Sequence, residues 1–181
     1  MNKDFSIDSL CKGEISGDIF PYSNGNFSEV NDAISNKLSV FLKKIDDEKS
    51  LKFIETNSGE NLSYVQTCIG NQIGEEIKTD LFSQKYYEGI TCIVSVMAPI
   101  YYISAYNWHV TKYNTGQIVN TFQTPFLNSS NINKEYSYIM SLFHQYMGKQ
   151  GFITLNFNEF SNTYCNNTQN IFQLLFYRIE L

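Results

Sequence analysis

Arginine is almost missing from this sequence, and basic residues in general are outnumbered. The 181 residues contain a single arginine, Arg178, and carry a formal net charge of −5. Arginine is the side chain that forms bidentate hydrogen bonds to phosphate or carboxylate groups, so this kind of contact is scarce here. A nucleic-acid surface needs clustered Lys and Arg to neutralise phosphates. The composition thus argues against nucleic acid as a partner.

Metal and cofactor motifs are absent as well. The four cysteines are Cys11, Cys68, Cys92 and Cys165. They show neither CxxC spacing nor the density of a disulfide scaffold. The two histidines, His109 and His144, form no HxH or HxxxH pair, and the glycines form no GxGxxG or GxxxxGK[ST] loop. We expect no metal and no cofactor.

Residues 1–22 contain six charged side chains and no apolar run that could form a signal-peptide core. With no export signal, the cysteines are expected to stay reduced, and the expected localisation is cytoplasmic. Abundant Asn and the excess of Lys over Arg are typical of an AT-rich genome.

The longest uncharged apolar stretch, 89–106, approaches the length of a membrane span. Pro99 interrupts it, and β-branched residues and Tyr dominate it. This pattern favours two buried strands that meet near Pro99. We therefore expect no membrane-spanning segment.

Length and a hydrophobic content of 43% fit one domain. Residues 1–25 are predicted to be an irregular N-terminal arm, and 26–181 a single α+β domain whose antiparallel meander packs against two main helices. Apolar residues at i, i+3 and i+4 predict helices over 27–45 and 134–147. The strand-like runs are 51–55, 62–69, 105–112, 117–122, 152–158 and 171–181. Residues 70–88 could form a short helix or a twisted edge strand.

Catalytic groups find little support in the sequence. Cys92 and His109 could form a nucleophile pair, because a thiolate needs a neighbouring base. However, Cys92 lies in a buried-looking run and nothing marks an oxyanion hole. Glu88 could act as a general acid, but it has no partner carboxylate. We expect a non-enzymatic protein.

Aromatic residues gather around the central hairpins, and most of them are expected to be core or cross-strand pairs. The polar-flanked members are better candidates for contact with a partner protein, because Tyr and Trp anchor interfaces. The candidate aromatic contacts are Tyr106, Trp108, His109 and Tyr113. The acids Glu75, Glu76 and Asp80 could steer a basic partner toward them.

The C-terminal third combines an amphipathic helix (EYSYIMSLFHQYM), a glycine stop, the strand FITLNFNEF and a closing apolar strand, FQLLFYRIEL. In this it resembles the small cytoplasmic immunity proteins encoded beside bacterial toxins. The resemblance implies a protein that binds and neutralises a toxin without catalysis.

Toxin immunity is therefore the first functional hypothesis, and the partner is expected to be another protein. One alternative is a ligand-binding or enzymatic α+β domain, whose apolar pocket would be lined by Tyr101, Tyr106 and Met97 with Glu88 or His109 as its polar group. Another is a phage or viral accessory protein that inhibits a host factor. A homodimer also stays open.

Overall fold

The computed structural model describes residues 27–48, 53–57, 64–96, 98–122 and 134–154 of the chain. In chain order the elements are α2 (Phe27–Glu48), β1 (Phe53–Asn57), β2 (Tyr64–Lys78), β3 (Phe82–Ser95), β4 (Ile100–Tyr113), β5 (Ile118–Phe122), α3 (Lys134–Lys149) and β6 (Ile153–Thr154). The sheet order is β1-β2-β3-β4-β5 with antiparallel neighbours, and the short β6 pairs in parallel with β4. The predicted α+β class with a meander and two helices is confirmed. The predicted arm at 1–25 and the closing strand at 171–181 lie outside the described residues.

Both helices bury one apolar stripe. The buried side chains of α2 are Val30, Ile34, Leu38, Phe41, Leu42 and Ile45. Those of α3 are Tyr136, Ile139, Phe143 and Met147. Ala33, which the periodicity assigns to the stripe of α2, is exposed because it lies on the flank of that stripe. The helices meet where the Phe41 and Phe143 rings pack edge to face, 5.1 Å apart.

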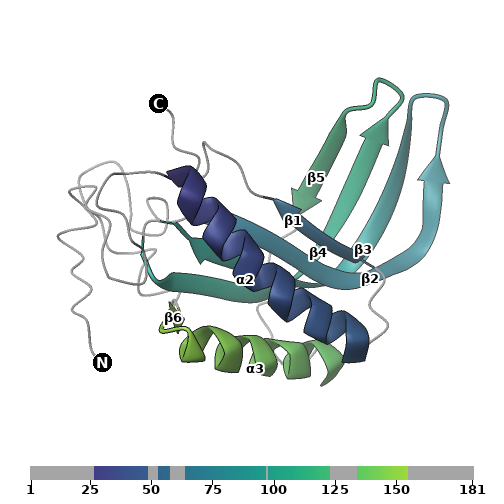
Figure 1. Ribbon diagram of the computed structural model, residues 1–181. Helices are drawn as coiled ribbons and strands as arrows, with labels where there is room; N and C mark the ends of the chain where they lie inside the picture. The colour runs from purple at the N-terminus through teal and green to yellow at the C-terminus, as the bar shows by residue number, and fades with distance from the viewer. Residues whose placement is uncertain (1–26, 49–52, 58–63, 97, 123–133, 155–181) are drawn as a thin grey trace, which may run out of the picture.

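The helices cover one face of the sheet at one end only. Alternate residues of the three long strands point at them, and these join the helices in one core. The strand residues of this core include Val65, Ile69, Ile90, Cys92, Val94, Tyr101, Ile103 and Ala105. Beyond this end the same strands run on past the helices (Figure 1, upper right).

We call the two parts by separate names. The covered sheet comprises 64–70, 89–95 and 100–106, next to the helices. The projecting sheet comprises 71–78, 82–88, 107–113 and 118–122, which extend away from them (Figure 1). β1 pairs only with 66–70, so within the described residues the outer edge of 71–78 has no strand beside it.

Two glycines mark the boundary. Gly70 and Gly89 pair directly across β2 and β3. A Cβ on Gly89 would fall onto the carbonyl oxygen of Ile69, and one on Gly70 would lie 2.7 Å from Cη2 of Trp108. Strand glycines allow this close approach of backbones and a sharp bend. The sheet therefore changes direction where no side chain stands in the way.

The ambiguous segment 70–88 is strand, turn and strand, so its helical alternative is wrong. Thr79 Oγ1 accepts hydrogen bonds from the backbone N–H groups of Leu81 and Phe82, at 3.2 and 3.1 Å, which closes the turn. The sequence also predicts a hairpin turn at Asn114–Gly116, between the strand-like runs 105–112 and 117–122. The turn is confirmed: Gly116 adopts a φ of 87° and its N–H donates to the carbonyl of Tyr113 at 2.9 Å.

The apolar run 89–106 forms the buried parts of β3 and β4, as Pro99 indicated. Within the ranges that the structure describes, no helix has the length and apolar character needed to cross a membrane.

Candidate functional site

The face of the projecting sheet that continues the helix-covered face carries apolar and aromatic side chains around a polar pair, Gln84 and Thr111. Register places Ile73, Tyr86 and His109 in one cross-strand row. The next rows add Ile77 opposite Gln84, and Phe82 opposite Tyr113. We call this surface the apolar face and define it by Ile73, Ile77, Phe82, Tyr86, His109 and Tyr113. Since side chains alternate along a strand, it is the direct extension of the core face.

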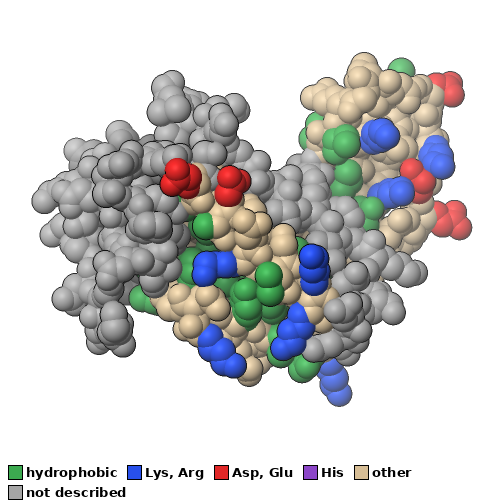
Figure 2. Space-filling view, in the orientation of Figure 1, with side chains coloured by type: hydrophobic (Ala, Val, Ile, Leu, Met, Phe, Trp, Pro, Cys, Tyr) green, Lys and Arg blue, Asp and Glu red, His purple; other side chains and the backbone are tan. Residues whose placement is uncertain are grey.

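Much of the apolar face is accessible. Ile77 is 46% and Tyr113 39% exposed, and Leu81 at the neighbouring turn is 73% exposed. The large exposed hydrophobic residues of the apolar face are Ile73, Ile77 and Tyr113. Ile118 is also exposed, but it pairs with Lys112 and lies on the opposite face. On the side of the projecting sheet that is in view, Figure 2 shows lysines and carboxylates with hydrophobic side chains scattered among them. Accessible apolar groups that share one face of a sheet mark interaction sites.

Neighbouring contacts hold the aromatic rings of this face in place. The Tyr86 and His109 rings lie 5.6 Å apart, and those of Phe82 and Tyr113 6.2 Å apart. The Tyr86 hydroxyl donates to Oε1 of Gln84 at 2.7 Å. Rings that are positioned before binding lose less conformational entropy when a partner arrives.

On the opposite face of the sheet, Trp108 lies in the projecting sheet and Tyr106 at the adjoining end of the covered sheet. Trp108 is 1% exposed and stacks on Tyr87 with ring centroids 5.6 Å apart, next to Cys68. Burial raises the pKa of Tyr106 well above its usual range. The sequence-based assignment of Trp108 as an interface anchor does not fit this burial, because the indole is already part of a small core. Of the four aromatic candidates, His109 and Tyr113 belong to the apolar face.

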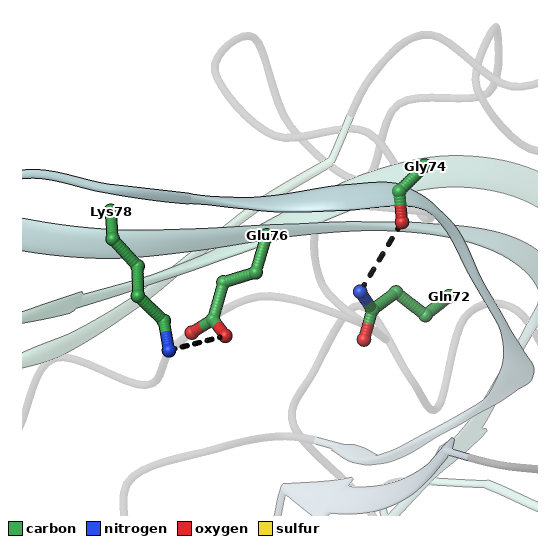
Figure 3. A network of polar contacts seen from close by, with 4 residues as sticks. All are labelled: Gln72, Gly74, Glu76 and Lys78. Atoms are coloured by element: carbon green, nitrogen blue, oxygen red, sulfur yellow. Dashed lines mark hydrogen bonds and ion pairs between the residues drawn. The ribbon is translucent and has the colours of Figure 1, made fainter.

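The acidic candidates lie along the edge of the projecting sheet. A β-bulge between Ile73 and Ile77 contains Glu75 and Glu76, and it begins at Gly74 with a φ of 68°. Glu76 Oε2 is 3.2 Å from Lys78 Nζ, and Gln72 Nε2 donates to the Gly74 carbonyl at 3.4 Å (Figure 3). The ion pair therefore compensates the charge of Glu76, one of the three acids predicted to steer a partner.

Glu75 and Asp80 remain exposed. Asp80 lies at the turn between β2 and β3, where its backbone carbonyl accepts a hydrogen bond from Nδ2 of Asn114. Lys78, Lys85 and Lys112 share the projecting sheet with these acids. The charge of the projecting sheet is therefore mixed, and the three lysines lie on the face opposite the apolar face.

The structure separates Cys92 from His109. Cys92 pairs with Ile103, six residues before His109 on β4, so the two are roughly 20 Å apart along the strand. Burial, and secondarily the neighbouring Cys68, raises the pKa of the Cys92 thiol. The thiol therefore stays protonated and lacks a base, and a nucleophile pair does not form.

Glu88 lies in a polar row with Asn71 and Asn107. The Tyr136 hydroxyl of α3 accepts from Asn71 Nδ2 and donates to the Glu88 backbone carbonyl, both at 3.0 Å. This network ties α3 to the sheet where the covered sheet ends. Among the described residues no three of His, Cys, Asp and Glu gather as metal ligands would.

The apolar pocket expected around Tyr101 is not supported. Tyr101 is 3% exposed, packs edge-on against Phe143 and shares a 2.6 Å hydrogen bond with Nδ1 of His144. Met97 lies outside the described residues. A pocket of about 440 Å³ lies instead at the tip of the projecting sheet, between the two turns.

The sequence analysis missed several residues of these sites. The missed members of the apolar face are Ile73, Ile77, Phe82 and Tyr86. Their alternation along 71–88 was the available signal, but the bulge and the turn interrupt it. The tip pocket could not be predicted from the sequence, because its lining residues come from three different strands and only the strand register brings them together.

Comparison with protein-family models, curated proteins and solved structures finds no match to this chain. The resemblance to immunity proteins therefore depends on the sequence segments alone. The structure describes the helix of that pattern and the start of its first strand, as α3 and β6.

Proposed function

We propose that this chain is a bacterial, cytoplasmic, non-enzymatic binding protein that neutralises a cognate toxin. The observation that carries the proposal is the apolar face. It lies on the same face of the sheet as the helix-covered core, beyond the polar row Asn71–Glu88–Asn107 and beyond the reach of α2 and α3. Its aliphatic and aromatic groups remain accessible to a partner.

The composition of the apolar face suits a protein partner. Interface cores combine aromatic and aliphatic anchors with a charged rim. Here Ile77 and Tyr113 supply accessible anchors, while Glu75 and Asp80 lie at the edge. A sheet that extends away from its helices can also enter a concave partner surface.

Recognition is expected through side chains of the apolar face and not through strand addition. The outer edge of 71–78 has no strand beside it among the described residues, and such an edge attracts other strands. The bulge at Gly74–Glu76 disrupts the regular ladder of this edge, and its acids are exposed or half-buried. Bulges and edge charges are the usual protection against unspecific pairing.

Toxin neutralisation is supported by the resemblance of the C-terminal third and by the net charge of −5, which favours a basic partner.

The test co-expresses the chain with the product of the gene beside its own and measures growth rescue and complex formation. Ile77→Asp places a charge on the apolar face. Val40→Asp makes the same change at an exposed aliphatic residue of α2, 62% exposed, and serves as the matched control. We expect Ile77→Asp to lose rescue and complex, and Val40→Asp to keep both.

Wild-type protein that neither rescues growth nor forms a complex would overturn toxin neutralisation. Rescue that survives Ile77→Asp but fails with Val40→Asp would move the binding surface to the helices and contradict the assignment of the apolar face. A complex with a host factor in place of the neighbouring product would favour the accessory-protein alternative.

A further inference from the structure

A row of polar and basic side chains crosses the projecting sheet on the face opposite the apolar face. Register aligns Lys78 of β2, Ser83 of β3 and Lys112 of β4 as direct cross-strand partners. Neighbouring strands lie about 4.8 Å apart. The two lysines therefore stand on either side of Ser83, about 10 Å apart at their Cα atoms, within reach of one small group held between them.

The row forms part of the pocket at the tip. Its volume is about 440 Å³, and the lining residues are Lys78, Thr79, Phe82, Ser83, Lys112, Tyr113, Asn114 and Gly116. This volume lies in the range of small-molecule sites. The lining contains two ammonium groups and no carboxylate, so it favours a negatively charged occupant.

The pocket is open to solvent and is flanked by two turns that are tied together. The Asn114 backbone N–H donates to the Leu81 carbonyl at 3.0 Å, and the Asn114 side chain donates to the Asp80 carbonyl. Thr79 Oγ1 is occupied within its own turn. The walls are thus set before any ligand arrives, while the Lys112 ammonium has no ion pair within the described parts of the chain.

Lys78 has a competing partner. Its ammonium group lies 3.2 Å from Glu76 Oε2, and Glu76 is not a lining residue (Figure 3). A ligand would therefore share Lys78 with Glu76, whereas Lys112 forms no ion pair with any described residue. Loss of the Glu76 charge should therefore raise the affinity for a ligand, whereas loss of the Lys112 charge should lower it.

We propose that the tip pocket binds a small organic anion, whose phosphate or carboxylate group lies between Lys78 and Lys112 and over the Ser83 hydroxyl. The pocket is larger than one oxyanion, so the ligand carries further atoms that fill the space toward the turns. Phe82 and Tyr113 line this pocket and also belong to the apolar face, but the groups that would hold the anion, Lys78, Ser83 and Lys112, lie on the opposite face. Anion binding therefore does not depend on the proposed toxin binding.

The first experiment titrates the full-length ¹⁵N-labelled chain with inorganic phosphate, phenyl phosphate and benzoate, followed by amide chemical shifts. We expect saturable shifts in 78–83 and 112–116, with phenyl phosphate tighter than inorganic phosphate. Tighter binding of phenyl phosphate than of benzoate assigns the head group as phosphate, and the reverse order assigns carboxylate. Shifts that do not saturate, or that spread equally over the lysines of α2, would overturn the proposal.

The second experiment repeats the titration with three variants. Lys112→Gln is expected to weaken binding about threefold, as for an exposed charge pair. Glu76→Gln is expected to strengthen it, because Lys78 is released. Lys85→Gln removes the same charge from the projecting sheet at a residue that does not line the pocket, and is expected to leave the affinity nearly unchanged.

Equal weakening by Lys85→Gln and Lys112→Gln would show attraction to the general charge of the sheet and would contradict a site. Unchanged affinity in Glu76→Gln would contradict the shared role of Lys78. These side chains are on the surface, and the amide spectrum of each variant reports directly whether it is folded.

Discussion

The covered sheet and the projecting sheet are built from the same three strands and differ in burial. On β3, Ile90, Cys92 and Val94 are fully buried beneath the helices, whereas 82–86 on the same strand are only half-buried. On β2 the change is sharper, since 67–70 are buried and 72–75 exposed. Strand pairing continues through both parts. What differs is the presence of α2 and α3.

This difference assigns the two parts different roles. Buried apolar surface contributes most of the stability of a fold, so the covered sheet with its helices carries that stability. The projecting sheet keeps its apolar groups accessible and presents them on a regular, hydrogen-bonded backbone. A rigid support for accessible side chains is what a binding surface requires.

The largest effect is expected in the covered part. Phe143 is 1% exposed and contacts both Phe41 and Tyr101, so Phe143→Ala should lower the free energy of unfolding by about 3–5 kcal/mol. Urea denaturation measures this loss. Tyr138→Ala on the same helix, at a side chain 47% exposed, should cost less than about 1 kcal/mol. Equal losses would mean that α3 does not bury the face described.

The boundary between the two parts is tested by Gly89→Ala. The added Cβ collides with backbone atoms of Ile69 and Gly70, which should cost about 1–3 kcal/mol and disturb the bend. Gly148→Ala, in α3 where a Cβ meets nothing within 4 Å, should be neutral or stabilising by up to about 1 kcal/mol. Thermal unfolding of the two variants measures this difference in stability. A neutral Gly89→Ala would refute the close approach at the boundary.

A small effect on stability is expected in the projecting sheet. Ile77→Asp changes an exposed strand residue, so the free energy of unfolding should fall by less than about 1 kcal/mol. The same urea experiment measures it, and Ile69→Asp in the covered sheet, where Ile69 has no exposure, should prevent folding or cost far more. Comparable losses for the two would erase the distinction between the parts.

The smallest effect concerns pH. Burial lowers the pKa of His144 from its ordinary 6.5, so the unfolded chain takes up this proton more readily than the folded one. The corresponding stability is fully present above pH 6.5 and is lost as the pH falls below it. Denaturation across this range should show a flatter pH dependence in His144→Gln than in wild type. Identical slopes would show that His144 does not contribute.

The helices were predictable because their apolar residues repeat with helical period over many turns. The helix predicted over 27–45 is observed as Phe27–Glu48, and the one over 134–147 as Lys134–Lys149. The strands that meet near Pro99 and the turn at Asn114–Gly116 followed from equally local signals. Local chemistry was sufficient in each of these cases.

The projecting sheet was only partly predictable, because its structure depends on pairing. The segment EEIKTDLFSQKYYE has no clean alternation, since a bulge and a turn lie within it. Sequence reasoning found His109, Tyr113 and the edge acids. It missed Ile73, Ile77 and the row Lys78–Ser83–Lys112, because a register decides which residues share a face. It also assigned Trp108 to the surface, since the glycine gap that receives the indole is visible only in three dimensions.

Native-state hydrogen exchange along β3 tests most directly the division of one sheet into a part that carries stability and a part that presents a surface. The amides of 90–95 should exchange only through global unfolding. Those of 82–86 should exchange through a smaller opening that leaves the helices in place. Uniform protection along the whole strand, at the free energy of global unfolding, would contradict the division.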